Sequence, residues 1–229
     1  MKSKENLVTQ LIAHLVCGLF ALMALLPFVL LIVASFTDNT WATANGFSFF
    51  PKKWSLDAYH YIAVQWNTIG RAYVMTIMVT AVGTAASILV TTLFAYAICQ
   101  IEVPGMKILS FMLIFTMLFN GGLVATYYTY VNYFHIRNTV WALILPGLMM
   151  NAFNVILVRN YFLNSIPISL IEAARIDGCG EIRTLVRIIL PLSKASLATI
   201  SLFYAVQHWN EFLRATIYIN TDSKWPLQV

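Results

Sequence analysis

Long stretches without charged residues constrain this chain more than any other feature. The range 73–98 contains no Asp, Glu, Lys or Arg, and four other stretches, 11–35, 108–131, 139–158 and 195–213, are also predominantly apolar. A helix needs roughly 20 mostly apolar residues to cross a hydrocarbon layer about 30 Å thick. The sequence therefore predicts an all-α polytopic membrane protein with five transmembrane helices.

The composition of the 229 residues excludes most other classes of protein. Hydrophobic residues make up 60% and charged residues only 10%, whereas soluble domains carry about a quarter charged residues. An ordinary soluble enzyme, a disordered chain and a low-complexity fibre are thus excluded. The net charge of +5 invites a nucleic-acid interpretation, but no dense Lys/Arg run is present. A basic surplus in a membrane protein is typical of cytoplasmic loops.

Several predicted spans contain residues that interrupt helices. Pro27 predicts a kink in the first span, which is too long for the apolar region of a cleaved signal peptide. Asn120-Gly121-Gly122 predicts a break near the middle of the third, and Pro146-Gly147 lies inside the fourth. The purely apolar run of the fifth stops at Val206, so this span reaches full length only by including polar residues.

The basic residues of the connections predict the orientation. The loop over 159–194 holds five of the fourteen Lys and Arg residues, which favours the cytoplasmic side for it and for the N-terminus. No connection is long enough to bury a core of its own, so residues 1–229 are predicted to form a single transmembrane domain. Any soluble active site must then belong to another chain.

One cytoplasmic segment, 165–192, has the pattern of a short helix, a turn and a second helix. Ser169 and Glu172 have the S-x-x-E spacing of a capping box, which predicts the start of the first helix. Gly178 is able to adopt the left-handed conformation that ends it.

Gly180 is a second helix breaker, and another helix is predicted from about Glu181. This second helix must break or bend at Pro191 as it enters the membrane. Such a rigid helix-turn-helix at the membrane surface is suited to docking against another protein.

The spacing within this segment supports a family resemblance. Glu172-Ala173-Ala174 is followed after three residues by Gly178, after nine more by Ile188, and after one more by Leu190-Pro191. The pattern resembles the EAA loop of bacterial ABC importer permeases. The resemblance implies a coupling helix that sits in a cleft of a cytoplasmic ATPase. The implied coupling residues are Glu172, Ala173, Ala174, Asp177, Gly178, Ile188, Leu190 and Pro191.

Three other stretches resemble the carbohydrate-uptake branch of this family. They are Asp177-Gly178, Trp209-Asn210-Glu211-Phe212, and Phe119-Asn120-Gly121-Gly122-Leu123 with Thr126-Tyr127. The third is similar to the subgroup that imports oligosaccharides or polysaccharide fragments.

Polar and aromatic residues at membrane depth are candidates for a substrate pathway. Asparagine is costly in a membrane unless it is paired or faces a cavity, and sugars bind to planar hydrogen-bonding groups and aromatic faces. Hydrogen bonding between helices and interfacial anchoring are the alternative explanations. The candidates are Asn120, Gly121, Gly122, Tyr127, Asn151, Asn154, Trp209 and Asn210.

The resemblance implies a permease subunit that imports a carbohydrate, and within this class an oligosaccharide, across the bacterial cytoplasmic membrane. Its implied partners are a homologous second permease, two ATPase subunits, an extracytoplasmic sugar-binding protein and membrane lipid, with no nucleic acid. The chain has no G-x-x-x-x-G-K-[ST] loop, so it is not expected to hydrolyse ATP itself. No cofactor and no metal site are expected.

Permeases of this branch have six spans, and the sixth follows a segment similar to Trp225-Pro226-Leu227-Gln228. Because the sequence stops at Val229, we expect a C-terminally truncated chain that lacks this helix. A non-transporting fragment therefore stays an alternative. An ion-coupled secondary transporter and a membrane-embedded enzyme are others, although neither inverted repeats nor a recognisable catalytic spacing is evident.

Overall fold

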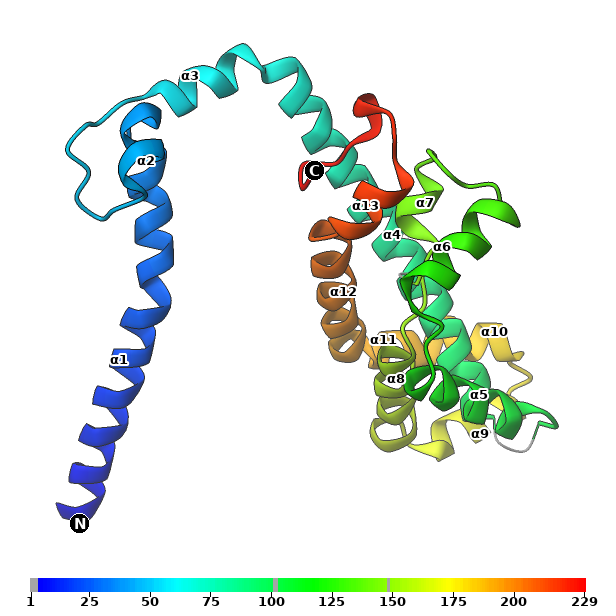
Figure 1. The fold of residues 1–229 in the computed structure, drawn as a ribbon. Coiled ribbons are helices and arrows are strands. Elements are labelled where there is room, and N and C mark those ends of the chain that lie inside the picture. The colour runs from blue at the N-terminus through cyan, green and yellow to red at the C-terminus, as the bar shows by residue number, and fades with distance from the viewer. Residues whose placement is uncertain (1–3, 101–102, 148) are drawn as a thin grey trace. The chain divides into compact units, whose positions relative to one another are not determined.

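The computed structural model describes residues 4–100, 103–147 and 149–229, and helices dominate it (Figure 1). Within these ranges no strand forms, and a single isolated β-bridge pairs Thr37 with Trp54. The predicted all-helical class is thus confirmed. The chain divides into two units, residues 1–69 and 70–229, and each has its own internal packing.

The first unit contains three helices. They are α1 (Lys4–Ser35), α2 (Asn39–Asn45) and α3 (Asp57–Val64). Helix α1 continues through Pro27 without a break, and the side chains over 9–29 are all exposed. A helix whose apolar side chains are exposed on all sides within its own unit is suited to lipid.

Short contacts organise the end of α1. The Ser35 hydroxyl lies 2.9 Å from the Tyr59 hydroxyl of α3, and the rings of Phe36 and Tyr59 are 5.2 Å apart. Asp38 caps α2, because its Oδ1 accepts a hydrogen bond from the backbone N–H of Trp41 at 2.8 Å.

The second unit is built around α4 (Trp66–Cys99), which begins in the last residues of the first unit. The following elements are α5 (Met106–Leu118), α6 (Gly122–Asn132), α7 (Trp141–Ile144), α8 (Ala152–Ser165), α9 (Ile168–Ile176), α10 (Glu181–Thr184), a π-helical turn (Leu185–Ile189), α11 (Leu190–Leu192), α12 (Lys194–Trp209), α13 (Leu213–Tyr218) and a 3₁₀ turn (Asp222–Lys224).

Helix α4 contributes to two separate apolar clusters. Near its C-terminal end, Ala95 and Ile98 are buried with residues of α5, α8, α12 and the π-helical turn. Nearer its N-terminal end, Val79 is buried with residues of α7 and α13. One long helix therefore connects the part of the unit around the 168–192 loop with the part around α13.

Two helices, Thr9–Ser35 and Trp66–Cys99, are each long and apolar enough to cross a membrane. Two further pairs qualify if each bent pair is one span. One of them is α5 with α6, between which the helix axis bends by 120°. The predicted break at Asn120-Gly121-Gly122 is confirmed, because Gly122 has φ +79° there. The described residues thus give two to four spans by this criterion, and the count of five stays a prediction.

The range 139–158, predicted as one span, does not form a continuous helix. Helix α7 ends at Ile144, and the turn that follows includes Pro146 and Gly147, which has φ +68°. Asn151 then caps α8, because its Oδ1 accepts the backbone N–H of Phe153 at 2.9 Å. The proline, the left-handed glycine and this cap stop one helix and start another.

The second bent pair joins Glu181–Leu192 to α12 at 85°. The bend lies at Ser193, two residues after the predicted position at Pro191. A proline has no N–H to donate to the preceding turn, and here the π-helical turn Leu185–Ile189 comes directly before the proline-containing α11. The helical disturbance is therefore spread over several residues on both sides of Pro191.

Candidate functional site

The short helix α9 starts differently from the sequence prediction. Its first residue is Ile168 and its N-cap is Pro167, which makes no side-chain cap hydrogen bond. Ser169 thus lies inside the first turn, and the predicted capping box of Ser169 and Glu172 is wrong. A proline disfavours the helical conformation of the residue before it, and Ile166 is extended here with φ −107° and ψ 116°, so the helix begins only after this point.

The end of α9 agrees with the prediction. Gly178 has φ +74°, the left-handed conformation that glycine adopts without strain. The backbone N–H of Gly178 donates to the Arg175 carbonyl at 3.0 Å, and that of Cys179 to the Ala174 carbonyl at 2.9 Å. These bonds satisfy the last carbonyls of the helix and reverse the chain toward α10.

The loop from α9 to α11 is attached to the unit along one side. Ala174 is buried, and Ile171 packs against the cluster formed by α4, α5, α8 and α12. Leu185 and Ile189 of the π-helical turn are buried in the same cluster. Apolar contacts therefore hold the ends of the loop in place.

The other side of the loop is exposed to solvent. Glu172 and Asp177 are exposed, Ile176 is 86% exposed and Ile182 is 77% exposed. Exposed isoleucines beside acidic side chains are suited to contact another protein, because a monomer rarely exposes large apolar side chains together without use.

The eight predicted coupling residues divide between these two sides. Ala174 is buried, Ile188 is half-buried, and Leu190 packs against the cluster. The exposed members are Glu172, Ala173, Asp177, Gly178 and Pro191. The three buried or half-buried residues thus lie where the loop packs against the apolar cluster, and the five exposed residues lie on its solvent-facing side.

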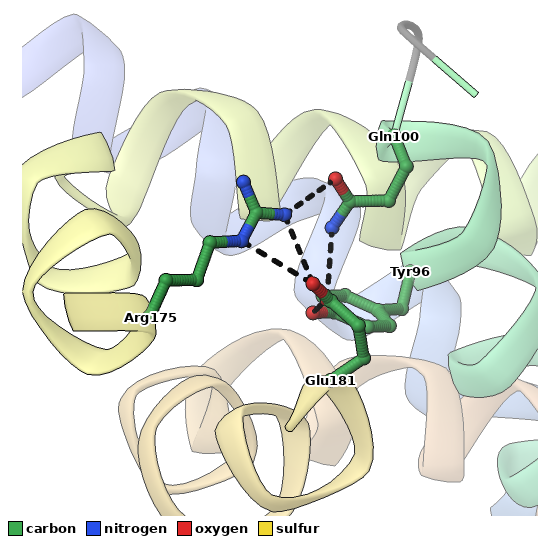
Figure 2. Close-up of polar contacts among 4 residues, drawn as sticks. All are labelled: Tyr96, Gln100, Arg175 and Glu181. Atoms are coloured by element: carbon green, nitrogen blue, oxygen red, sulfur yellow. Dashed lines mark hydrogen bonds and ion pairs between the residues drawn. The ribbon is translucent and has the colours of Figure 1, made fainter. Parts of the chain in front are cut away.

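Four side chains form a polar cluster beside the loop, which we call the Glu181 cluster: Tyr96, Gln100, Arg175 and Glu181 (Figure 2). Arg175 donates to Glu181 Oε1 from Nε at 3.2 Å and from Nη2 at 3.1 Å. The Tyr96 hydroxyl and Gln100 Nε2 donate to Glu181 Oε2, the latter at 3.3 Å. Arg175 Nη2 also donates to Gln100 Oε1 at 3.1 Å. The cluster joins α9, α10 and the C-terminal end of α4.

Sequence reasoning did not assign a role to Glu181, Tyr96 or Gln100. The pairing of Arg175 with Glu181 across a two-glycine turn is a local signal that indicates Glu181. Tyr96 and Gln100 precede Glu181 by 85 and 81 residues, so only the tertiary fold brings them to it.

A groove of about 540 Å³ contains two of the predicted pathway residues. Asn151 and Asn154 line it together with Gln207 of α12, and the remaining lining residues are Leu202, Phe203 and Val206. Three amide side chains in an apolar surface are able to bind hydroxyl groups while the apolar residues contact a sugar ring or another helix. Gln207 was not among the candidates, although Trp209 and Asn210 of the same polar run were, because only the tertiary fold brings Gln207 to the groove beside Asn151 and Asn154.

The other pathway candidates lie elsewhere. Asn120 Oδ1 accepts the backbone N–H of Gly122 at 2.8 Å, so it stabilises its own turn, where Gly121 is exposed. The Tyr127 ring packs against Tyr218 at 5.1 Å. Trp209 accepts a hydrogen bond from Gln228 through its carbonyl, and Asn210 follows as the exposed C-cap of α12.

Residues 63–222 match the family described as "Binding-protein-dependent transport system inner membrane component". The match includes α4 to α13 and therefore both the 168–192 loop and the groove. Members of this family are membrane subunits and not enzymes, which does not favour a membrane-embedded enzyme or an ion-coupled transporter.

Two relatives come from Bacillus subtilis (strain 168). The chain is 42% identical over 211 residues to the "Polygalacturonan/rhamnogalacturonan transport system permease protein YtcP". The aligned residues cover 92% of this chain and 72% of that protein. It is also 42% identical over 207 residues to "Protein LplC", and this alignment covers 90% of this chain and 69% of that protein.

A solved structure shares the fold over the whole chain. It is a chain of a bacterial ABC transporter involved in the import of the acidic polysaccharide alginate, with a TM-score of 0.86 and 30% sequence identity. The match covers 100% of this chain and 80% of that chain. This protein therefore belongs to the binding-protein-dependent transport system inner membrane components, the permease subunits of ABC importers in the cytoplasmic membrane.

Proposed function

We propose that this permease imports a carbohydrate of the oligosaccharide or polysaccharide-fragment class, and that the 168–192 loop couples it to a cytoplasmic ATPase. The single observation that carries the proposal is the division of the loop. Buried Ala174, Leu185 and Ile189 attach it to α4, α8 and α12, while Glu172, Ile176 and Asp177 stand exposed. Such an element receives force at its free surface and passes it to the helices behind it.

The substrate class is supported by the groove and by the relatives. Sugars present many hydroxyl groups, and Asn151, Asn154 and Gln207 offer amide donors and acceptors in one groove. One relative is a polygalacturonan/rhamnogalacturonan permease, and the structural neighbour belongs to an alginate importer. Oligosaccharides of uronic acids are therefore the first substrates to test.

The proposed assembly is supported by the exposed groove on one chain. The groove is open along the surface of α8 and α12, and in this proposal a second, homologous permease covers it and completes the pathway. Two ATPase subunits dock on the two permeases, and an extracytoplasmic binding protein delivers the sugar. Closure of the ATPase dimer moves the coupling loops, and the permeases alternate between two states that open to opposite sides.

In this proposal the N-terminus and the 168–192 loop are cytoplasmic. The single transmembrane domain crosses at α1, α4, the α5–α6 pair, the range 139–158 and α12. The α8 end at Ser165 and the α9 start at Ile168 then lie at the cytoplasmic boundary. Five of the fourteen basic residues in the loop over 159–194 support this orientation.

The test is uptake by proteoliposomes that contain the complete transporter, its ATPase and its binding protein. Labelled oligogalacturonides and neutral malto-oligosaccharides are supplied separately. We expect ATP-dependent uptake, and we expect Glu172→Lys to reduce both the retention of the ATPase and the uptake at least tenfold. The matched control is Asp222→Lys, because it makes the same charge change at an exposed position outside the loop.

Normal uptake and ATPase retention in Glu172→Lys would reject the coupling role of the loop. Absence of ATP-dependent uptake for every sugar, with the assembled complex intact, would reject the carbohydrate assignment. Uptake of neutral but not acidic oligosaccharides would keep the class and reject the uronic acid substrates.

A further inference from the structure

From the geometry of the Glu181 cluster we infer that Glu181 is a positioning residue, which fixes the angle of the coupling helix α9 and connects α9 to α4. This inference rests on the proposed function of the loop. It adds a specific mechanical link, formed by one carboxylate that accepts hydrogen bonds from Tyr96, Gln100 and Arg175 (Figure 2).

The turn between α9 and α10 does not fix this angle by packing. Gly178 and Gly180 flank Cys179, and a Cβ built on either glycine would have no heavy atom within 4 Å outside its immediate neighbours. The glycines of the turn therefore do not restrain the angle between the two helices, and contacts across the turn contribute to it. Arg175 in the last turn of α9 and Glu181 at the start of α10 make such a contact with two hydrogen bonds to one oxygen.

The same carboxylate is tied to a third element. Tyr96 and Gln100 lie in the last turn of α4 and directly after it, and both donate to Glu181 Oε2. The two oxygens of Glu181 thus face different partners, Arg175 on one side and α4 on the other. A displacement of α9 is transmitted to α4 as long as both sides stay bonded.

Helix α4 is the element through which such a displacement reaches the rest of the unit. It is buried against α8 and α12 near Ala95 and against α7 and α13 near Val79. Moreover, α8 and α12 carry the residues that line the groove. The Glu181 cluster therefore joins the exposed loop to the helix that both apolar clusters share.

The position of the cluster argues against a role in holding the fold together. The side chains of Arg175 and Glu181 are 48% and 52% exposed, and solvent screens an ion pair at such a site. The apolar residues Leu185 and Ile189 already attach the loop. Loss of the Glu181 carboxylate should therefore leave the subunit folded and its ATPase docked, and should loosen the angle of α9.

The first measurement is the position of the coupling helix in the assembled transporter. Spin labels at Ser169→Cys and Leu93→Cys, in a background in which Cys17, Cys99 and Cys179 are replaced by serine, report the distance between α9 and α4. Both label sites are exposed, and neither belongs to the surface assigned to the ATPase. We expect Glu181→Gln and Tyr96→Phe to widen the distance distribution at least twofold, with Asp222→Asn and Tyr133→Phe as matched controls that leave it unchanged.

The second measurement is the number of sugars imported per ATP hydrolysed, together with retention of the ATPase. We expect Glu181→Gln and Tyr96→Phe to lower this ratio at least fivefold with normal retention. Glu181→Arg alone should lower it further. Glu181→Arg combined with Arg175→Glu should recover only the part of the loss that comes from the α9 side, because an arginine at position 181 has no acceptor for the Tyr96 hydroxyl and Gln100 Nε2. Such partial recovery separates the ion pair from the hydrogen bonds to α4.

An unchanged distance distribution and an unchanged ratio in both Glu181→Gln and Tyr96→Phe would overturn the inference. Loss of ATPase retention in these variants would also overturn it, because it would place Glu181 in docking. The proposed function fails by a different result, namely normal retention and uptake in Glu172→Lys.

Discussion

The imidazole ring of His208 in α12 lies directly against Gly83 of α4. A Cβ added to Gly83 would be 2.6, 2.7 and 2.8 Å from three atoms of the ring. His208 is buried, and its Nε2 lies 3.3 Å from the Ser87 hydroxyl one turn further along α4. The missing side chain of Gly83 is therefore what lets α4 and α12 approach this closely.

We expect Gly83→Ala to destabilise the protein by about 1–3 kcal/mol, because the new methyl group has to displace a buried ring. Equilibrium unfolding in detergent measures the effect. Gly83→Ala in a His208→Ala background should be clearly less harmful than in the parent. Gly18→Ala in α1 is the matched control and should be neutral, since a Cβ there meets nothing within 4 Å.

The fully buried Tyr204 connects three elements by hydrogen bonds. Its hydroxyl lies 2.6 Å from the Thr91 hydroxyl of α4, and it accepts the backbone N–H of Asn151 at 3.1 Å. We expect Tyr204→Phe to cost about 1–2 kcal/mol in the same unfolding measurement, because the buried Thr91 hydroxyl and the half-buried Asn151 N–H lose their partner.

Tyr133→Phe is the control for the loss of a hydroxyl, because Tyr133 is exposed. This substitution should change the free energy of unfolding by less than about 0.5 kcal/mol. Equal effects of the two substitutions would contradict the role given to Tyr204. The double variant Thr91→Val/Tyr204→Phe should be more stable than the sum of the single effects predicts.

The two glycines of the coupling turn should respond differently to alanine. Gly178 has φ +74°, where alanine is strained by roughly 1–2 kcal/mol, whereas Gly180 has φ −71°, which alanine adopts freely. Hydrogen exchange over 168–184 should therefore rise roughly 5–30-fold in Gly178→Ala and stay unchanged in Gly180→Ala. Steric contact does not differ between them, because a Cβ at either position meets open space.

Asn151 has two separable roles, the cap of α8 and a place in the groove. We expect Asn151→Ala to cost about 0.5–2 kcal/mol, and Asn151→Ser to retain the cap and the stability. A groove that binds sugar predicts that Asn151→Ser and Asn154→Leu both reduce uptake. Of the two Asn151 variants, only Asn151→Ala should destabilise the fold, because it alone removes the cap. Full uptake in Asn154→Leu would remove that residue from the pathway.

Several features of this protein follow from the sequence by itself. Uncharged apolar runs determine the helical membrane class, because no soluble fold hides so many apolar residues. The left-handed turn at Gly178 and the break at Asn120-Gly121-Gly122 were also predictable, since each depends on the local chemistry of a few residues. The start of α9 was predicted wrongly because Pro167 competes with Ser169 as the starting signal.

Tertiary structure decided the rest. Which polar residues meet depends on how helices pack, so Tyr96 with Glu181, Thr91 with Tyr204 and Gly83 with His208 are pairs that no local pattern indicates. The same holds for the groove that gathers Asn151, Asn154 and Gln207 while Asn120 and Tyr127 lie apart from it. Local sequence determines which segments form apolar helices and where they break. The packing of helices that are distant in sequence determines which polar side chains meet and which of them share a groove.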